Sequence, residues 1–575
     1  MPARLARARQ RTADILQCGQ LATAPLLART RMFLSSRRQT HGSPANFKRG
    51  LKRSATRADH RRVHSPPRSW LERWLDTCRS LSDLRASNPM MDAVVDEIDG
   101  RMIRVGNQWL ADFASCNYLG FDLEPEIIAA IPPALAAWGT HPSWSRMLGS
   151  PVLYEEIEER LTALLGCEDS LLFPTITHIH ASVVPVLAGS GTILLDARAH
   201  KTLYDGCQVA RGHGATIQRF RFEDPAHLEQ LLSEAHSDPT LICMDGVNSM
   251  TGNAPDLAAF ARVARAHGAL LYVDDAHGFG VIGERRPDET SPYGMRGNSI
   301  VRHLGLSYDD VVLVGGFSKS YSSLLAFVAC PTAIKNLLKV TAAPYLYSGP
   351  SPVASLASTL AGFDVNERKG DLLRADLHRM TARVLDALTG LGAATPNRSG
   401  LPIVEVPLAD HEQIDAVGRF LFERGIYVTL AAYPLVPKEE VGFRIQVTAA
   451  NTDEQITRLT GVLGQLADRF PLQPATVDAG ARLERAAGAS VRHPSRGAPG
   501  SSTSRSPPPL RACICSCRER RGAGRSSMSS PDRRWWRSSW ASASTARPRR
   551  GHGGGSRSAR DCSSWATSTP TAIRT

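Results

Sequence analysis

Three side chains with the chemistry of a catalytic site follow two apolar runs of this sequence. Asp274 and His277 lie at the end of LLYVDDAH, and Lys319 comes three residues after VVLVGG. Taken singly such residues are common, since an Asp–His pair often hydrogen-bonds a turn and a lysine after a strand is usually solvated. At the ends of buried strands of one sheet they fit pyridoxal phosphate chemistry: a lysine binds the aldehyde, an aspartate keeps the pyridine nitrogen protonated and a histidine lies beside the ring oxygen.

Short apolar runs alternate with amphipathic stretches between about residues 95 and 470. The runs have the length of strands and are TILLD (192–196), LICMD (241–245), LLYVDD (270–275), VVLVGG (311–316) and AFVAC (326–330). The stretches 153–165 and 255–268 repeat apolar residues at helical spacing. Buried strands separated by helices predict an α/β fold with a mostly parallel sheet covered on both faces, and such sheets bind ligands at the carboxyl ends of their strands.

The pattern changes after about residue 365. A long helical stretch is followed by LPIVEVPL (401–408), a helix near 411–424, FRIQVTAA (443–450) and a last helix, which predicts a smaller α+β domain. We therefore expect five parts along the chain: a basic arm (1–70), an N-terminal segment (71–135), a large cofactor-binding domain (136–360), a small C-terminal domain (361–472) and a tail (473–575).

The net charge of +13 comes from the two ends of the chain. Residues 1–70 hold 16 basic and 2 acidic residues and residues 471–575 hold 19 and 5, whereas residues 71–470 hold 33 and 48. The part able to fold is thus acidic, which argues against nucleic acid as its main partner. No run of about 18 apolar residues predicts a membrane span. The central cysteines lack metal-ligand spacing, so we expect no metal site, free thiols and a reducing, cytoplasmic location.

The two ends have unusual compositions. Residues 1–70 are rich in arginine and poor in acidic residues, which fits a targeting peptide, an upstream start codon or a disordered basic arm. The tail lacks Lys, Phe, Tyr and Asn but holds 19 Arg, a composition that a GC-rich gene gives when it is translated in the wrong frame. Without apolar periodicity we expect the tail to be disordered, rather than to form a metal cluster at Cys513, Cys515 and Cys517.

The motifs, taken together, resemble a known family. From FASCNYLGF (113–121) through DDAHGFG and GGFSKSYSS to a helix ending near 470, the chain is similar to the α-oxoamine synthases among the fold-type I pyridoxal phosphate enzymes, such as 8-amino-7-oxononanoate synthase, 5-aminolevulinate synthase and serine palmitoyltransferase. The resemblance implies a seven-stranded sheet in the large domain and a homodimer with shared active sites. It also implies the condensation of an amino acid with an acyl thioester, usually with loss of CO2, to an α-amino ketone.

The resemblance assigns roles to single residues. Lys319 matches the lysine that carries the cofactor, Asp274 the partner of the pyridine nitrogen, and His277 the histidine near the phenolic oxygen. His200 matches the histidine stacked on the cofactor ring, and Ser249 a serine that contacts the cofactor. These matches imply that Lys319, His200, Asp274 and His277 take part in catalysis.

Two further matches concern the substrate. Arg444, in FRIQVTAANT, matches the arginine that grips the α-carboxylate of the amino acid through a planar, bidentate guanidinium. Asn117, in CNYLG, matches an asparagine near the substrate.

The phosphate-binding segments depart from the family pattern. The loop expected to read S-G-aromatic, with an asparagine three residues on, reads FPTITHIH here, so that Thr175, Ile176 and Thr177 are the cofactor contacts and His180 replaces the asparagine. Hydroxyl groups can still donate to phosphate, but Ile176 lacks the conformational freedom of glycine. A threonine of the family is Gly316 here, and we expect Ser318 to substitute for it; the loop reaching the partner subunit's phosphate keeps Ser348.

Other functions of the same fold remain open on these residues. An aminotransferase or a retro-aldol lyase uses the same lysine, aspartate and histidine, because all three reactions begin by labilising a bond at the amino acid's Cα. A catalytically silent subunit is less favoured, because Lys319, Asp274, His277 and Arg444 are all present.

Overall fold

The computed structural model describes residues 69–475 except 236–237, 287–288, 290 and 310. The expectations for the basic arm up to residue 68 and for the tail from 476, the cysteine cluster included, lie outside the described residues. Within the described part, none of the helices combines the length and the apolar character that crossing a bilayer requires.

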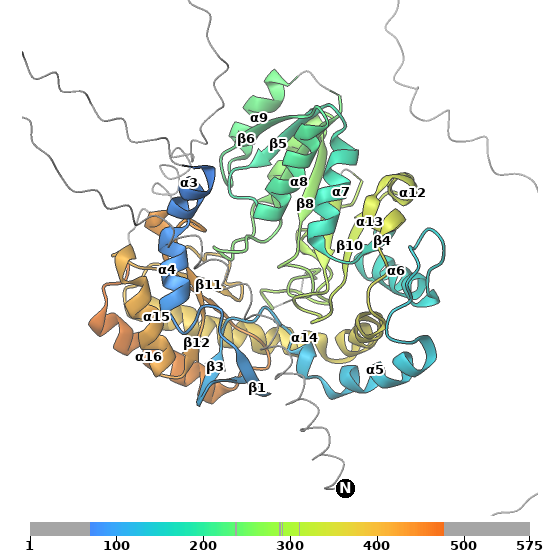
Figure 1. Cartoon of the computed structure of the whole chain (residues 1–575). Helices are drawn as coiled ribbons and strands as arrows, with labels where there is room; N and C mark the ends of the chain where they lie inside the picture. The colour runs from blue at the N-terminus through green and yellow to red at the C-terminus, as the bar shows by residue number, and fades with distance from the viewer. Residues whose placement is uncertain (1–68, 236–237, 287–288, 290, 310, 476–575) are drawn as a thin grey trace, which may run out of the picture. The chain divides into compact units, whose positions relative to one another are not determined.

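A seven-stranded sheet forms the centre of the described chain, with strand order β4-β10-β9-β8-β7-β5-β6 (Figure 1). Its strands are β4 (Asp169–Phe173), β5 (Thr192–Asp196), β6 (Thr216–Phe220), β7 (Thr240–Asp245), β8 (Leu270–Asp274), β9 (Val311–Gly316) and β10 (Ala326–Cys330). Strands β5 to β9 pair in parallel, and β10 runs antiparallel to both of its neighbours. All five apolar runs predicted to be strands are strands of this sheet.

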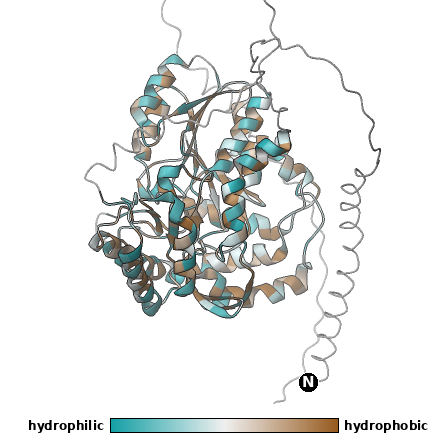
Figure 2. Ribbon diagram, turned by 60° about the vertical axis from the view of Figure 1, so that its left-hand side comes forward, coloured by the Kyte–Doolittle hydropathy of each residue, from teal (hydrophilic) through white to brown (hydrophobic). Residues whose placement is uncertain are grey.

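Both faces of the sheet are buried, which explains why the strand sequences are continuously apolar. In β7, Leu241 and Cys243 belong to one buried cluster, whereas Ile242 and Met244 belong to the other. Helices α7 (Ile176–Ala188), α8 (Lys201–Gly212) and α12 (Thr332–Thr341) cover the first face, and α6 (Val152–Leu165), α9 (Pro225–Glu234) and α10 (Leu257–Ala266) contribute to the second. Helices of the described chain carry both hydrophilic and hydrophobic residues (Figure 2).

Two smaller sheets accompany the central one, and the first of them joins the N-terminal and C-terminal parts. One contains β1 (Val95–Asp99), β2 (Met102–Val105), β3 (Gln108–Asp112) and β12 (Ile426–Tyr427), and the other contains β11 (Ile403–Pro407), β14 (Gly442–Gln446) and β13 (Thr429–Ala431). Because β12 pairs in parallel with β3, segments more than 300 residues apart share one sheet. The strands predicted within 401–408 and 443–450 are therefore present, although the second ends at Gln446.

Further helices complete the described chain. They are α3 (Trp70–Thr77), α4 (Arg79–Ser87), α5 (Pro125–Trp138), α11 (Ile300–His303), α13 (Ala343–Tyr347), α14 (Val353–Gly390), α15 (Ile414–Glu423) and α16 (Asp453–Arg469), with short 3-10 turns at Phe121–Leu123, His411–Gln413 and Lys438–Glu440. The long helix expected after about residue 365 begins earlier, at Val353.

The segment FPTITHIH is not the loop that the sequence suggested. Strand β4 ends at Phe173 and α7 begins at Ile176, with Thr175 as the N-cap whose side chain accepts the backbone N–H of His178. Ile176 is the first helical residue and has no left-handed backbone, so this position does not need the freedom of a glycine. The loss of glycine's conformational freedom at Ile176 therefore does not strain the backbone here.

Candidate active site

A cavity of about 180 Å³ opens where the parallel strands end. Its lining gathers most of the residues singled out in the sequence: Lys319, Asp274, His277, His200, Ser249, Ser318, Thr175, Ile176 and Thr177. The remaining lining residues are Thr202, Asp245, Val247 and Ala276. Asp245 ends β7 and faces Asp274 in register across the sheet, so the polar end of LICMD in the sequence was a signal that could have found it.

Asp274 is held at both carboxylate oxygens. Oδ1 accepts the backbone N–H of Ala276 at 3.0 Å, and Oδ2 lies 2.9 Å from Nε2 of His180. Burial on its own would raise the pKa of Asp274, but the hydrogen bond from His180 and the charge of Lys319 outweigh it and lower the pKa below its ordinary value. The cavity therefore presents a fixed negative charge.

His277 is a buried, neutral imidazole. Its Nδ1 lies 2.8 Å from the hydroxyl of Tyr118. Burial, reinforced by the positive charge of Lys319, holds the pKa of His277 well below its usual value. Tyr118 escaped the sequence reasoning although it directly follows Asn117, because nothing in the sequence shows that CNYLG packs against DDAH.

His200 is the N-cap of helix α8 and lines the cavity. Its backbone N–H donates to Oδ1 of Asp245 at 3.0 Å, and its Nδ1 accepts from the backbone N–H of Thr202 at 3.4 Å. Partial burial lowers the pKa of His200, so the imidazole is neutral at pH 7. With Nδ1 as the acceptor, Nε2 carries the proton and can donate to a ligand.

Part of the cavity lining is suited to an anion. Thr175, Thr177 and Ser318 line it with hydroxyl groups, and Thr175 stands at the N-terminus of α7, where backbone N–H groups and the helix dipole favour negative charge. Ser318 Oγ lies 3.5 Å from the point that a Cβ on Gly316 would occupy. That Ser318 replaces the hydroxyl missing at 316 stays a prediction.

Three predicted residues do not line this cavity. Arg444, on β14, borders it by donating from Nη1 to the backbone oxygen of Ser249 at 2.6 Å, and its buried Nε has no hydrogen-bond partner among the described residues. Asn117 lies beside Tyr118, and its backbone oxygen accepts the N–H of Gly120. Ser348 follows α13 and was expected to serve the partner's site rather than this one.

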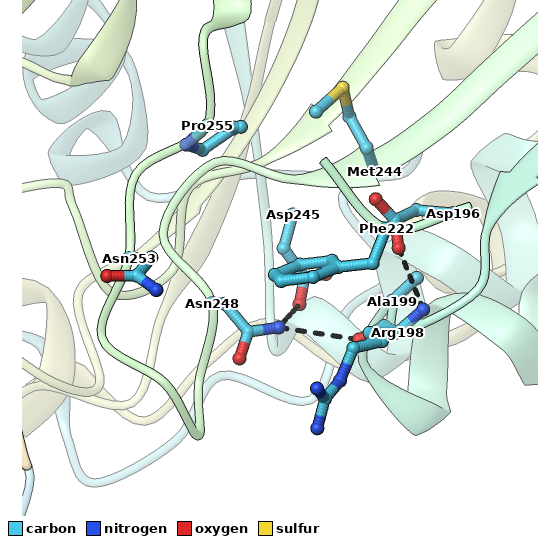
Figure 3. A pocket seen from close by; sticks show the side chains of 9 residues that line it. All are labelled: Asp196, Arg198, Ala199, Phe222, Met244, Asp245, Asn248, Asn253 and Pro255. Carbon is cyan, nitrogen blue, oxygen red and sulfur yellow. Dashed lines mark hydrogen bonds between the residues drawn. The ribbon is translucent and has the colours of Figure 1, made fainter. Parts of the chain in front are cut away.

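A second, much smaller cavity adjoins the first through Asp245 (Figure 3). Its volume of about 10 Å³ is close to the minimum for one water molecule, so it cannot hold a cofactor. Burial raises the pKa of Asp196 on its wall to about 7. The nearby Asn248 amide points to Oδ2 of Asp245 at 3.5 Å and to the backbone oxygen of Arg198 at 3.4 Å.

The larger cavity fits pyridoxal phosphate by the chemistry of its donors. An amine, an ionised carboxylate and a set of hydroxyl and backbone N–H donors are what the aldehyde, the ring nitrogen and the phosphate require, and all three line one cavity. Lys319, Asp274 and the Thr175–Thr177 segment with Ser318 could hold these three parts.

Comparisons with known proteins agree with this chemistry. Residues 112–463 match the family model described as aminotransferase class I and II. The 8-amino-7-oxononanoate synthase of Pseudomonas putida KT2440 is 34% identical over 396 residues, covering 68% of this chain and 95% of that protein. The synthase of the same name from Stutzerimonas stutzeri A1501 is 35% identical over 382 residues, covering 66% and 92%.

Solved structures give the same result. The serine palmitoyltransferase of Sphingomonas wittichii superposes with a TM-score of 0.64 at 26% identity, covering 70% of this chain and all of that one. A chain described as SPT with PLP superposes with a TM-score of 0.63 at 25% identity, covering 73% and 100%. This chain therefore belongs to the α-oxoamine synthases, pyridoxal phosphate-dependent acyl-transferring enzymes with the fold of the class I and II aminotransferases.

Proposed function

We propose that this chain condenses an amino acid with an acyl thioester, the acyl group being carried by coenzyme A or by a carrier protein. The observation that carries the proposal is the single cavity that places Lys319, Asp274 and His277 together, with Arg444 at its border. In the overall reaction the amino acid's Cα bonds to the thioester carbonyl carbon, the thiol leaves and the carboxyl group departs as CO2. The product is an α-amino ketone.

The chain's own residues divide this work. When bound, pyridoxal phosphate delocalises negative charge that develops at the amino acid's Cα. Arg444, whose guanidinium borders the cavity through Ser249, would hold the substrate carboxylate, and Lys319 takes the proton from Cα and returns one to the product. Asp274 holds the proton on the ring nitrogen.

The two histidines act as neutral groups. His200, whose Nε2–H is free to donate, polarises the carbonyl oxygen of the thioester while Cα attacks. His277, whose Nδ1 is held by Tyr118, would contact the cofactor's phenolic oxygen through its other ring nitrogen, as the family resemblance implies. Because both pKa values are lowered, neither histidine adds a positive charge that would disfavour a protonated ring nitrogen on the cofactor.

The test is thiol release, followed with a thiol-reactive dye, from acyl thioesters offered with a panel of amino acids. We expect release that requires both substrates and pyridoxal phosphate and that is lost in Lys319→Ala but retained in Lys339→Ala, a lysine of α12 outside the cavity. An enzyme that instead converts amino acids to keto acids without consuming thioester would be an aminotransferase, and the proposal would be wrong.

The proposal includes a homodimer, supported by exposed apolar side chains on two segments that are in contact. Met147 and Leu148 are 62% and 84% exposed, and Tyr347 is 82% exposed. The segments that carry them are in contact, because the guanidinium carbon of Arg146 lies 5.1 Å from the ring centroid of Tyr345. Large exposed apolar side chains gathered in one region are typical of a protein interface.

A cytoplasmic location is also proposed. Its support is that the described cysteines are all unpaired, as in a reducing compartment: Cys78, Cys116, Cys167, Cys207, Cys243 and Cys330.

A further inference from the structure

A buried imidazole connects the cavity's aspartate to a tyrosine beneath it. His180 lies in the second turn of α7 and is fully buried. Its Nε2 is 2.9 Å from Oδ2 of Asp274, and its Nδ1 is 2.9 Å from the hydroxyl of Tyr272 in β8. The tyrosine and the aspartate alternate on the same strand, so both side chains point to the face that α7 covers.

The direction of the hydrogen bond between His180 and Asp274 follows from the charge of the aspartate. The pKa of Asp274 is lowered, and an ionised carboxylate only accepts, so Nε2 of His180 carries a hydrogen and donates it to Oδ2. Desolvation raises the pKa of Tyr272 well above its usual value, so its hydroxyl keeps its proton and can donate it to Nδ1 of an imidazole whose hydrogen is at Nε2. In this arrangement the chain Tyr272–His180–Asp274 is satisfied at every atom.

The hydrogen bonds from Tyr272 through His180 leave one side of the Asp274 carboxylate for a ligand. With Oδ1 held by the N–H of Ala276 and Oδ2 by His180, the carboxylate cannot rotate, and it still lines the cavity. An asparagine, which the family resemblance places at position 180, is shorter than histidine. Its amide would end near the site of Nδ1 and reach Tyr272, but not Asp274.

We propose that His180 is a positioning residue for the reaction: with Tyr272 behind it, it fixes the Asp274 carboxylate in the orientation and charge state that binds the cofactor's ring nitrogen. This inference rests on the proposed function. It assigns to an α7 residue that does not line the cavity an effect on the cofactor, transmitted through Asp274.

Several other titratable groups face Asp274 and set a background that the substitutions leave unchanged. They are Asp245 on β7, Asp275 after β8, His200 before α8 and Lys319 after β9. Among the hydrogen bonds described for the Asp274 side chain, His180 supplies the one from another side chain.

The experiment compares His180→Asn with His180→Gln in the full-length holoenzyme. Glutamine places an amide near Nε2 and keeps the contact with Asp274, whereas asparagine loses it. The readouts are the dissociation constant of pyridoxal phosphate, by fluorescence titration, and the pH at which isotope-labelled ring nitrogen loses its proton, by NMR. We expect the His180→Asn enzyme to bind pyridoxal phosphate about tenfold more weakly, because it loses one charge-assisted hydrogen bond. We also expect the ring nitrogen of its bound cofactor to lose the proton at a lower pH. We expect His180→Gln to stay within about threefold of the unsubstituted enzyme.

Two more variants keep the test decisive. Tyr272→Phe removes a single hydroxyl and should weaken cofactor binding by about twofold to fourfold, because the imidazole tautomer is no longer fixed. His303→Gln changes a half-buried histidine of α11 whose Nδ1 contacts the oxygen of Gly283, and it should leave both readouts unchanged. If the His180→Asn protein does not fold, the cofactor affinities of the His180→Gln and Tyr272→Phe enzymes test the role of His180.

The outcomes separate this inference from the proposed function. Asparagine and glutamine variants that match the unsubstituted enzyme in both readouts would overturn the role of His180 while leaving the proposed function intact. A chain that binds the cofactor and shows these effects, but releases no thiol, would support His180 and contradict the condensation. Equal losses in the asparagine and glutamine variants, with Tyr272→Phe unchanged, would indicate packing alone and would also overturn the inference.

Discussion

The side chain of Ile176 fills the space that a side chain at position 316 would need. A Cβ placed on Gly316 would lie 2.7 Å from Cδ1 of Ile176, closer than real Cβ contacts. Both positions depart from the family pattern, which has a glycine at the first and a threonine at the second. The larger residue at position 176 and the smaller one at position 316 therefore compensate for each other in volume. Together they replace one hydroxyl, where the cofactor's phosphate is expected to bind, with an apolar side chain.

This relationship predicts a coupled pair of substitutions. In Gly316→Thr alone, Ile176 must rotate toward the cavity, so we expect cofactor affinity to fall by about tenfold. In the double variant Ile176→Gly/Gly316→Thr the space is free again and a hydroxyl is gained, so affinity should return to within about threefold of the original. Fluorescence titration with pyridoxal phosphate measures both.

Gly461→Thr is the matched control, because a Cβ at that exposed position of α16 meets no atom within 4 Å. It should bind the cofactor like the unsubstituted chain. Additive effects of the two substitutions in the pair would contradict the coupling, since independent sites add.

The sequence predicted the sheet and the cavity lining better than the contacts behind the lining. Strands such as VVLVGG were recognisable because strands that are buried on both faces contain few polar residues. The carboxyl ends of parallel strands lie at one edge of the sheet, so Asp274 and Lys319 are expected there however the strands are connected. The chain from Tyr272 through His180 was not predictable in this way. It depends on the turn of α7 that faces β8, and the segment containing His180 was expected to be a loop.

Lys319 should be the residue that binds the cofactor covalently. Reduction of the holoenzyme with borohydride, followed by proteolysis and mass spectrometry, should find the pyridoxyl group on the peptide that contains Lys319, because Lys319 lines the cavity. Lys335 offers an internal control, since its ammonium is engaged by Asp169 at 2.7 Å and by Glu158 at 3.2 Å. A pyridoxyl group found on Lys335 would remove the basis for the site.

Arg444→Ala should weaken binding of the amino acid much more than binding of the cofactor. The guanidinium borders the cavity through Ser249, and losing a charge-assisted pair with the substrate carboxylate costs about 2–4 kcal/mol, or about 30-fold to 1000-fold in affinity. The amino-acid dependence of the holoenzyme's absorption spectrum measures this. Arg398→Ala removes an exposed arginine paired with Glu223 and should change neither affinity, whereas equal effects of the two variants would refute the assignment.

Leu148→Asp should convert the proposed homodimer into monomers. A carboxylate placed in an apolar interface is desolvated without a partner, which costs several kcal/mol in each of two symmetric copies. Sedimentation velocity measures the change, and Val94→Asp is the control because Val94 is also exposed but lies in the N-terminal segment before β1. Dimers that persist in Leu148→Asp would place the interface elsewhere.

Asp275 should make the folded protein less stable as the pH rises. The carboxyl is buried next to Asp274, its Oδ2 accepts the N–H of Ile300 at 2.9 Å, and burial raises its pKa to about 8. In the unfolded chain the pKa is about 3.9, so between these two values the folded protein holds a proton that the unfolded chain releases. Its stabilising contribution is therefore complete below about pH 4 and is lost as the pH approaches about 8, by up to about 1.4 kcal/mol per pH unit.

Asp275→Asn removes this titration while keeping an oxygen to accept from Ile300. Urea unfolding at one fixed protein concentration, from roughly pH 5 to 8, measures the unfolding free energy of this variant. Its decrease with pH should be shallower by up to about 1.4 kcal/mol per pH unit, the contribution of one proton. Asp196 and Glu405, whose pKa values burial raises to about 7, act in the same direction and should leave a residual slope. Asp309→Asn, at an exposed carboxylate, should reproduce the unsubstituted slope. An Asp275→Asn protein with that same slope would show that Asp275 is ionised in the folded state across this range.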